Sequence, residues 1–407
     1  MADPIIIVGA GQAGASLAAK LRALGHEGPI TLIGEEPAPP YQRPPLSKKY
    51  LLGEMEEARL QLRPPEFYED EKIELLTGVA ATALDPAAKT VTLSDGTTRR
   101  YDKLALTTGS RPRRLPASIG GDLPGVFTVR DLADVDAMAP AFREGARVLI
   151  VGGGYIGLEA AAVAAAKGLR VTVVEAAERI LQRVAAPATS DFFRALHESH
   201  GVEIREGAAL ARLVGSASVE AAELADGERL EVDFVVVGVG VQPNQELAAE
   251  AGLAVDETLG GIAVDAAGRT SDANVFAAGD CASFPYEGRR VRLESVQNAI
   301  DQAEAAAAAM LGEALSYAPT PWFWSDQYDV KLQIAGLNQG YDRTVERAGA
   351  EAAKSVWYFQ GDRLLAVDAM NDPRAYMVGK RLIEQGKSPT VEAVGDPSVD
   401  LKSLMRG

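Results

Sequence analysis

The sequence predicts an α/β protein with two parallel-sheet nucleotide-binding units and a C-terminal α+β unit. Two observations predict the parallel units, because "IIIVGAGQAG" at 5–14 and "VLIVGGGYIG" at 148–157 each join an apolar strand to a glycine-rich turn. The third observation is the pair of strand-like segments "KLQIAG" and "SVWYFQGDRLLAVDAM", which suggest an antiparallel sheet followed by a late helix near "AYMVGKRLIEQG".

Length, charge and cysteine content exclude several function classes. A chain of 407 residues is long enough for two or three domains. Its net charge of −16 argues against nucleic acid or an anionic membrane as the main partner. The single cysteine, Cys281, excludes an internal disulfide, a redox dithiol and a cysteine-based metal site, so we predict no metal and a reducing cytoplasm. The first apolar run is too short for a membrane span or a signal sequence.

The first glycine turn opens a complete βαβ unit. Gly9, Gly11 and Gly14 have the G-x-G-x-x-G spacing, and the helical stretch "ASLAAKLRALG" and the strand "ITLIGEE" follow. These glycines allow a tight turn, close approach of a pyrophosphate, and close packing of helix on strand. The helix N-terminus then faces the phosphates, and Glu35 can accept hydrogen bonds from ribose hydroxyls.

The second turn repeats this pattern with Gly152, Gly154 and Gly157, an alanine-rich helix and the strand "RVTVVE" ending on Glu175. A carboxylate pairs with free ribose hydroxyls and repels a 2′-phosphate, so Glu175 favours NADH over NADPH. Two dinucleotide sites in one chain allow FAD to stay bound while NADH visits and delivers a hydride.

This arrangement of two nested Rossmann-like units resembles the FAD/NAD-linked reductase family. The segment "YDKLALTTGSRP" at 101–112 is similar to the family's crossover out of the FAD domain, and "TSDANVFAAGDCA" at 270–282 is similar to its closing motif. The resemblance implies that Asp280 hydrogen-bonds the ribityl and phosphate part of FAD. The expected layout is a discontinuous FAD domain at 1–111 and 244–319, an NADH domain at 112–243 and a C-terminal domain at 320–407.

Within this family, dithiol reductases are excluded because they need a cysteine pair. NADH oxidases and peroxidases need one redox cysteine after the first βαβ unit, where this chain has "PAPPYQRPPLSKKYLLGE", and Cys281 is expected to be a buried packing residue. The segments "RPPLSK", "GGGYIGLEAA", "RLESVQNAIDQA" and "PWFWSDQY" closely resemble the reductases that supply [2Fe–2S] ferredoxins in bacterial cytochrome P450 and aromatic-ring dioxygenase systems. A flavin is needed there because NADH gives two electrons and the cluster accepts one at a time.

The same resemblance assigns residues. It implies that Lys48 lies beside the flavin N5 and pairs with Glu159; the alternative is a solvated lysine and a helix-start acid. It implies an electron-exit role for Trp324, with core packing as the alternative for both Trp322 and Trp324. The expected FAD contacts are Ala13, Glu35, Lys48, Ala81, Arg130, Asp280 and Val296, and the expected NADH path is lined by Gly154, Ile156, Glu159 and Glu175.

Docking of an acidic ferredoxin should use basic side chains, yet the expected docking helix at 297–315 has Glu304 and Glu313 and neither lysine nor arginine. The candidate basic groups are Arg289, Arg290, Arg292 and the cluster of Arg111, Arg113 and Arg114, and a merely solvated face is the alternative.

We predict an NADH-dependent ferredoxin reductase. The alternatives are an NADH oxidase-like flavoprotein and a protein similar to apoptosis-inducing factor, whose redox state governs partner binding.

Overall fold

The computed structural model describes residues 3–314, 316–350 and 352–406, and the chain divides into two compact units. Unit 1 comprises residues 1–43, 56–111 and 241–319, and unit 2 comprises residues 44–55, 112–240 and 320–407. The short segment 44–55, which holds Lys48, therefore groups with unit 2, although the sequence-based layout places it in the FAD domain.

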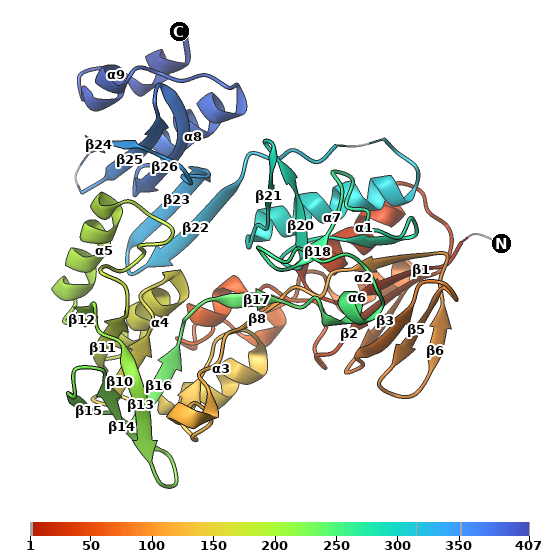
Figure 1. The fold of residues 1–407 in the computed structure, drawn as a ribbon, viewed down its shortest axis with the longest axis horizontal. Coiled ribbons are helices and arrows are strands. Elements are labelled where there is room, and N and C mark those ends of the chain that lie inside the picture. The colour runs from red at the N-terminus through yellow and green to blue at the C-terminus, as the bar shows by residue number, and fades with distance from the viewer. Residues whose placement is uncertain (1–2, 315, 351, 407) are drawn as a thin grey trace. The chain divides into compact units, whose positions relative to one another are not determined.

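Unit 1 is organised around a five-stranded parallel sheet. The strand order is β19 (Val275–Ala277), β7 (Lys103–Leu106), β1 (Ile5–Val8), β2 (Ile30–Gly34) and β3 (Ile73–Thr77). All residues of β1 and β2 are buried, as expected for parallel strands covered on both faces. Helices α1 (Gln12–Ala23) and α7 (Val296–Met310) pack side by side against this sheet (Figure 1).

Smaller elements complete unit 1. Helices α2 (Pro65–Asp70) and α6 (Glu246–Glu250) are short. One three-stranded sheet contains β4 (Ala81–Asp85), β5 (Thr90–Leu93) and β6 (Thr98–Arg100), and another contains β18 (Ile262–Ala263), β20 (Ala282–Tyr286) and β21 (Arg289–Val291). Strands β8 (Ser110–Pro112) and β17 (Val241–Pro243) pair with each other.

Unit 2 contains a second five-stranded parallel sheet. Its order is β12 (Glu203–Glu206), β11 (Arg170–Glu175), β10 (Arg147–Val151), β16 (Phe234–Val237) and β9 (Val126–Phe127). The helices of this part are α3 (Leu132–Met138), α4 (Tyr155–Ala166) and α5 (Pro187–Ser199). An antiparallel sheet of β13 (Leu210–Gly215), β14 (Val219–Leu224) and β15 (Arg229–Glu231) adjoins it.

The C-terminal part of unit 2 is the predicted antiparallel sheet. Its order is β22 (Trp322–Gln327), β23 (Val330–Gly336), β26 (Arg363–Met370), β25 (Lys354–Gln360) and β24 (Arg343–Ala348), followed by α8 (Pro373–Glu384) and α9 (Val391–Gly395). Alternate side chains of β25 serve two cores, since Tyr358 packs with Phe193 of α5 and Trp357 packs with Tyr376 of α8. The predicted fold class, including the late helix, is confirmed.

Candidate functional site

The first glycine turn is built for close backbone packing at two positions and open space at the third. Gly9 has a φ of +113°, and a Cβ there would lie 2.2 Å from the carbonyl oxygen of Thr107. A Cβ on Gly14 would lie 2.0 Å from the carbonyl oxygen of Gly9. A Cβ on Gly11 would meet nothing within 4 Å. The turn therefore requires glycine at its ends and leaves room at its centre for a ligand's pyrophosphate.

The second turn has the same construction in unit 2. Gly152 has a φ of +104°, and its Cβ would lie 2.5 Å from the carbonyl oxygen of Gly238. A Cβ on Gly157 would lie 2.1 Å from the carbonyl oxygen of Gly152, whereas one on Gly154 would meet its nearest neighbour only at 3.9 Å. Among the described residues, no side chain caps α1 or α4, so the amides at each helix start are open to an anion. Both cradles fit a dinucleotide.

The two predicted ribose acids differ in their surroundings. Glu35 follows β2 and is exposed, and the neighbouring Glu36 is held by the Tyr41 hydroxyl and the Arg43 guanidinium. Glu175 ends β11, and its Oε2 accepts a 2.8 Å hydrogen bond from the Gly153 amide. Its Oε1 accepts another of 2.8 Å from the Ala177 amide. Each oxygen keeps lone-pair capacity for a ribose hydroxyl, so Glu175 is preset beside the second turn.

The closing motif of unit 1 lies against the first turn. A Cβ on Gly279 would be 3.1 Å from the Cβ of Ala13, so residues far apart in the sequence adjoin here. Asp280 follows directly, and its Oδ2 accepts a 2.7 Å hydrogen bond from the Ser110 hydroxyl. Val296 is the first residue of α7 and Ala81 the first of β4, both also in unit 1. Unit 1 thus brings Asp280 to the first turn, as the FAD prediction requires.

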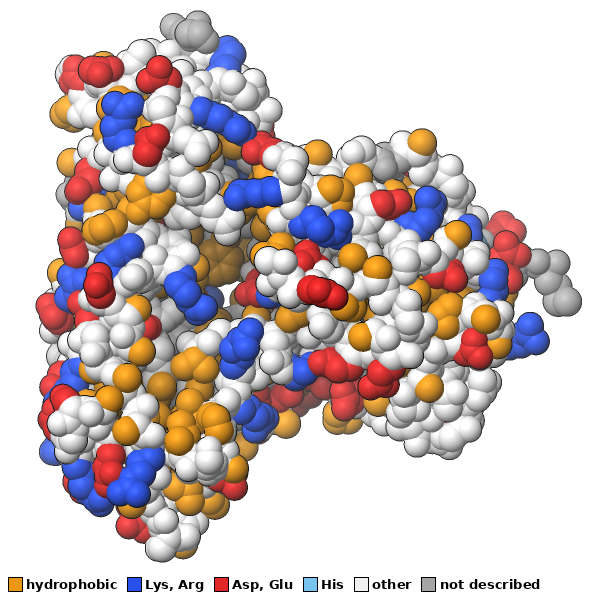
Figure 2. Space-filling model, in the orientation of Figure 1, with side chains coloured by type: hydrophobic (Ala, Val, Ile, Leu, Met, Phe, Trp, Pro, Cys, Tyr) orange, Lys and Arg blue, Asp and Glu red, His pale blue; other side chains and the backbone are white. Residues whose placement is uncertain are grey.

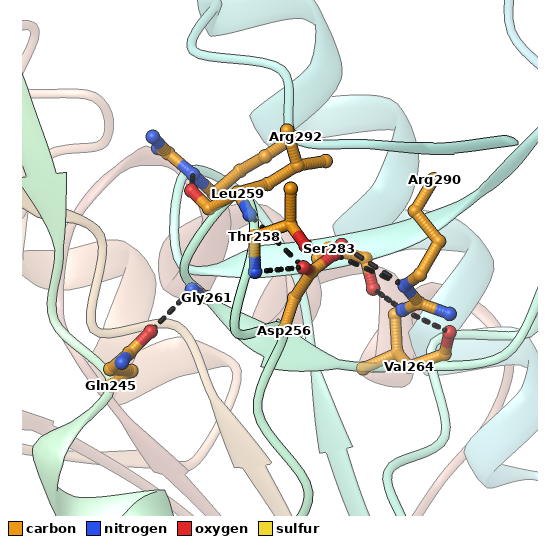
Figure 3. Close-up of polar contacts among 9 residues, drawn as sticks. All are labelled: Gln245, Asp256, Thr258, Leu259, Gly261, Val264, Ser283, Arg290 and Arg292. Atoms are coloured by element: carbon orange, nitrogen blue, oxygen red, sulfur yellow. Dashed lines mark hydrogen bonds and ion pairs between the residues drawn. The ribbon is translucent and has the colours of Figure 1, made fainter.

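Arg290 and Arg292 form hydrogen bonds and ion pairs with other residues of unit 1 (Figure 3). Arg290 forms an ion pair of 3.4 Å with the buried Asp256 and donates to the Ser283 hydroxyl, as Figure 3 shows. Arg292 donates to the carbonyl oxygens of Leu259 and Asp280. Both arginines therefore have internal partners, and their role in docking stays a prediction.

Arg292 has a further ion pair, and the predicted docking residues Arg111 and Arg289 can also be placed. Arg292 also forms a 2.7 Å ion pair with Glu294, and only 12% of its side chain is exposed. Arg111 forms a 2.6 Å ion pair with Glu246, which raises the pKa of Arg111. Arg289 lies on β21 and is exposed. Neutralising Arg111 or Arg292 would therefore disturb unit 1 as well as its surface charge.

The predicted pairing of Lys48 with Glu159 is present within unit 2. Lys48 Nζ lies 3.1 Å from Glu159 Oε1, and Glu159 sits on α4 with only 3% of its surface exposed. The Ser47 hydroxyl donates to Glu159 Oε2 at 2.9 Å, and the Ser325 hydroxyl donates to Oε1 at 2.7 Å. Burial raises the pKa of Glu159, while the Lys48 ammonium and the two hydroxyls act in the opposite direction.

Trp324 lies on β22 and is half-buried. Its ring and that of Trp322 are 5.6 Å apart, and Trp322 also contacts Tyr376 of α8. Trp322 packs against the buried cluster of the C-terminal sheet, which supports the packing alternative for that residue.

The remaining predicted residues have varied environments. Ile156 is 44% exposed in the first turn of α4, where an apolar side chain is available to a ligand. Arg130 is half-buried, precedes α3 and belongs to unit 2. Cys281 is fully buried, and burial raises the pKa of its thiol, as expected for a packing residue.

Among the described residues, no cluster of three or more potential metal ligands is present. No helix in the described part of the chain has the length and apolar character that a membrane span requires.

Sequence reasoning missed several polar partners of Glu159. Ser47 adjoins Lys48 within "RPPLSK", and Ser325 and Gln327 lie within "PWFWSDQY", so both motifs carried a signal that was not used. His197 joins the same hydrogen-bonded group from α5, and no motif marked it.

Two glycine turns on parallel sheets, together with a C-terminal antiparallel sheet, define a class of oxidoreductases that use two dinucleotides. The chain belongs to the pyridine nucleotide-disulphide oxidoreductase family, whose sequence model matches residues 3–303. The Reductase C-terminal family matches residues 322–405. Members of the first family use FAD and NAD(H), which confirms the predicted cofactors.

Two curated relatives match almost the full chain. Rhodocoxin reductase of Rhodococcus erythropolis is 43% identical, over 98% of this chain and 93% of that protein. Putidaredoxin reductase of Pseudomonas putida is 42% identical, over 99% of this chain and 97% of that protein. The crystal structure of a covalent putidaredoxin reductase–putidaredoxin complex matches with a TM-score of 0.95 and 41% identity, over 99% of this chain and 98% of that one. The predicted resemblance is confirmed.

Proposed function

We propose that this chain is an NADH-dependent ferredoxin reductase that passes single electrons to a [2Fe–2S] ferredoxin, which in turn supplies a cytochrome P450 or a ring-hydroxylating dioxygenase. The observation that carries the proposal is the presence of two dinucleotide cradles in a chain whose single thiol is buried. FAD, when bound, supplies the step from a two-electron donor to a one-electron acceptor. The near full-length similarity to rhodocoxin and putidaredoxin reductases supports the choice of acceptor.

In this proposal unit 1 holds FAD. Gly9, Gly11 and Gly14 place the turn and the start of α1 against the pyrophosphate. Asp280, fixed by the Ser110 hydroxyl, is proposed to hydrogen-bond the ribityl and phosphate part of FAD. Further FAD contacts are proposed for Ala13, Glu35, Lys48, Ala81, Arg130 and Val296.

The second turn binds NADH in this proposal. Gly152, Gly154 and Gly157 hold the pyrophosphate, and Glu175 accepts from the ribose and repels a 2′-phosphate. Ile156 offers an exposed apolar surface beside the turn.

Lys48 is proposed to contact the flavin ring near N5. Its ammonium favours the electron-rich reduced form, and Glu159 holds that ammonium in place. Trp324 is proposed as the residue through which electrons leave. A single buried cysteine supports a reducing cytoplasm as the location.

Docking of the ferredoxin is proposed to use basic side chains, with apolar contact around Trp324 as the alternative. The candidates are Arg289, Arg290 and Arg292 and the cluster of Arg111, Arg113 and Arg114, of which Arg289, Arg290, Arg113 and Arg114 are exposed. On the face drawn in Figure 2, the described Lys and Arg side chains stand among Asp and Glu side chains. Because the chain carries a net charge of −16, a local basic group has to act against the overall field within about 8 Å at physiological salt.

The test is NADH-driven reduction of cytochrome c, measured with and without an added [2Fe–2S] ferredoxin. The proposal expects fast ferricyanide reduction in both cases and cytochrome c reduction that depends on ferredoxin concentration. Rapid NADH consumption with oxygen as acceptor, unaffected by ferredoxin, would instead identify an NADH oxidase-like flavoprotein. Tight partner binding that responds to flavin redox state without turnover would favour the apoptosis-inducing factor alternative.

A further inference from the structure

Glu159 is the end of a buried chain of hydrogen bonds that runs through β22 to α5. The Ser325 hydroxyl lies 2.7 Å from Glu159 Oε1, and the Gln327 amide nitrogen lies 3.2 Å from the Ser325 oxygen. Gln327 Oε1 lies 2.8 Å from His197 Nε2, and the Tyr328 hydroxyl lies 3.1 Å from His197 Nδ1. Ser325, Gln327 and His197 are each 0% exposed. All five residues belong to unit 2.

The chemistry of the groups orders the chain in one direction. A carboxylate only accepts, so Ser325 donates to Glu159 and uses a lone pair to accept from the Gln327 amide. The Gln327 carbonyl oxygen then faces His197 and requires a proton on Nε2. His197 Nδ1 is left bare and accepts from the Tyr328 hydroxyl. Every bond donates toward Glu159, and His197 is a neutral Nε2–H tautomer.

Burial is consistent with a neutral histidine. Loss of solvent lowers the pKa of His197 to about 4; the hydrogen bond to Gln327 acts in the opposite direction, and the nearby His200 lowers the pKa further. The groups that act on Glu159 are Lys48 and Ser47 from the 44–55 segment and Ser325 from β22. Lys48 supplies the positive charge among them, and the directed chain behind Ser325 polarises the hydroxyl that faces the carboxylate.

The alternation of β22 explains how one strand carries this chain. Ser325 and Gln327 lie two residues apart and share a face with Phe323, whose ring is 5.0 Å from that of Tyr155 on α4. Trp322 and Trp324 lie on the opposite face. The polar chain is therefore separated from the tryptophan pair by the sheet itself.

We propose that Ser325, Gln327 and His197 are positioning residues that keep Glu159 ionised and thereby hold the Lys48 ammonium in place. This inference rests on the proposed role of Lys48 beside the flavin. A buried carboxylate that lost these donors would take up a proton, and Lys48 would lose its counter-ion.

The first test observes the chain directly. The protein has three histidines, His26, His197 and His200, so ¹⁵N-histidine NMR of the holoenzyme can assign each of them by single substitutions. We expect His197 as the Nε2–H tautomer, without titration between about pH 5.5 and 8. Gln327→Leu should change the tautomer populations of His197. A proton on Nδ1, or titration near the ordinary pKa of histidine, would overturn the directed chain.

The second test measures the rate of flavin reduction by NADH as a function of pH in Ser325→Ala. Removing the Ser325 hydrogen bond, which stabilises the charged carboxylate, should raise the apparent pKa of Glu159. The rate should therefore fall on the acidic side and recover as pH rises through the raised value. Ser325→Thr keeps the hydroxyl and should restore the original profile. A Ser325→Ala profile identical to that of the unmodified protein would contradict the proposal.

Ser355→Ala is the matched control. Ser355 is also 0% exposed in the C-terminal sheet, where it accepts a 3.1 Å hydrogen bond from Trp357. Ser355→Ala should leave the pH profile of flavin reduction unshifted. A shift equal to that of Ser325→Ala would show that the loss of any buried hydroxyl in this sheet changes the profile in the same way. Lys48→Met separates the two proposals. An unchanged rate of flavin reduction in this variant would refute the role of Lys48 beside the flavin, while the tautomer of His197 would still test the chain of hydrogen bonds behind Glu159.

Discussion

The two glycine turns have one backbone construction but hold their acids differently. The Cβ positions of Gly14 and Gly157 would each fall about 2 Å from a carbonyl oxygen of the same turn, at 2.0 and 2.1 Å. Glu35 beside the first turn is exposed, whereas Glu175 beside the second is fixed by two backbone amides. A ligand that arrives and leaves in every cycle benefits from a preorganised site, because less ordering accompanies each binding event. The second turn has that property.

The turns also differ in what completes them. The first turn is joined by the segment around Gly279 and Asp280, far away in the sequence. The second turn is completed by Glu175, which lies within the same βαβ unit and accepts a hydrogen bond from the Gly153 amide. A site that needs distant chain segments is suited to a ligand that stays bound through folding and turnover. These differences match the proposed division between bound FAD and exchanging NADH.

Replacing the last glycine of each turn should have the largest effect. In Gly14→Ala and Gly157→Ala, the new methyl group overlaps a carbonyl oxygen, so the helix must move away from the strand. We expect a loss of about 1–3 kcal/mol in stability for each variant, with loss of FAD in Gly14→Ala. Thermal unfolding and flavin content per chain measure these effects. Normal stability in both variants would show that the turns tolerate looser packing than the structure indicates.

Removing the preset acid should affect nucleotide choice. Glu175→Ala loses a charge-assisted acceptor, so the KM for NADH should rise about tenfold and the preference over NADPH should narrow. Steady-state ferricyanide kinetics with both nucleotides provide the measurement. Glu35→Ala is the matched control and should leave the NADH/NADPH ratio unchanged. A constant ratio in Glu175→Ala would place specificity elsewhere.

The segment around Asp280, which completes the first site, can be loosened by replacing Arg292. Arg292→Ala removes bonds to the carbonyl oxygens of Leu259 and Asp280, so the Asp280 segment should be held less firmly. We expect FAD to dissociate severalfold faster, as followed by flavin fluorescence after dilution. Arg289→Ala, on the same hairpin but exposed, should retain FAD normally. Equal retention of FAD in both variants would show that Arg292 does not hold the Asp280 segment in place.

The smallest effect is expected at Cys281. In Cys281→Ser the hydroxyl can replace the thiol as donor to the carbonyl oxygens of Leu106 and Ala278. Turnover with NADH and ferricyanide should stay within about twofold of the unmodified protein, since a buried thiol with a raised pKa takes no part in the chemistry. A variant that binds FAD but has lost turnover would contradict a thiol-free mechanism.

The parts predicted from the sequence are those with local causes. The apolar strands, the glycine spacing and the acids at 35 and 175 lie within single βαβ units, and the structure has them in those units. Helix α7 ends at Met310, whereas the expected helix ran on through "LGEAL" at 311–315, of which Leu315 lies outside the described residues. Gly312 has a φ of +96°, a left-handed backbone conformation that is typical just after a helix end. The alanine-rich pattern before it gave no sign of this end.

The parts that were missed depend on contacts between distant segments. The ion pair of Arg290 with Asp256 was not predicted, because the hairpin of β20 and β21 is needed to bring the two side chains together. His197 reaches Gln327 only because α5 packs against the C-terminal sheet. No periodicity or spacing in the sequence encodes such pairs.

The most direct test of the division between the turns replaces their middle glycines. Gly11 and Gly154 have φ values of −91° and −83°. A Cβ on Gly11 would meet nothing within 4 Å, and one on Gly154 would make only an ordinary contact at 3.9 Å, so Gly11→Val and Gly154→Val should fold normally and obstruct only the ligand. Flavin content after desalting, followed by anaerobic addition of NADH and then dithionite, is measured for both. We predict that Gly11→Val loses FAD, and that Gly154→Val keeps one FAD per chain that dithionite reduces and NADH does not. Loss of FAD from Gly154→Val, or its rapid reduction by NADH, would contradict the account.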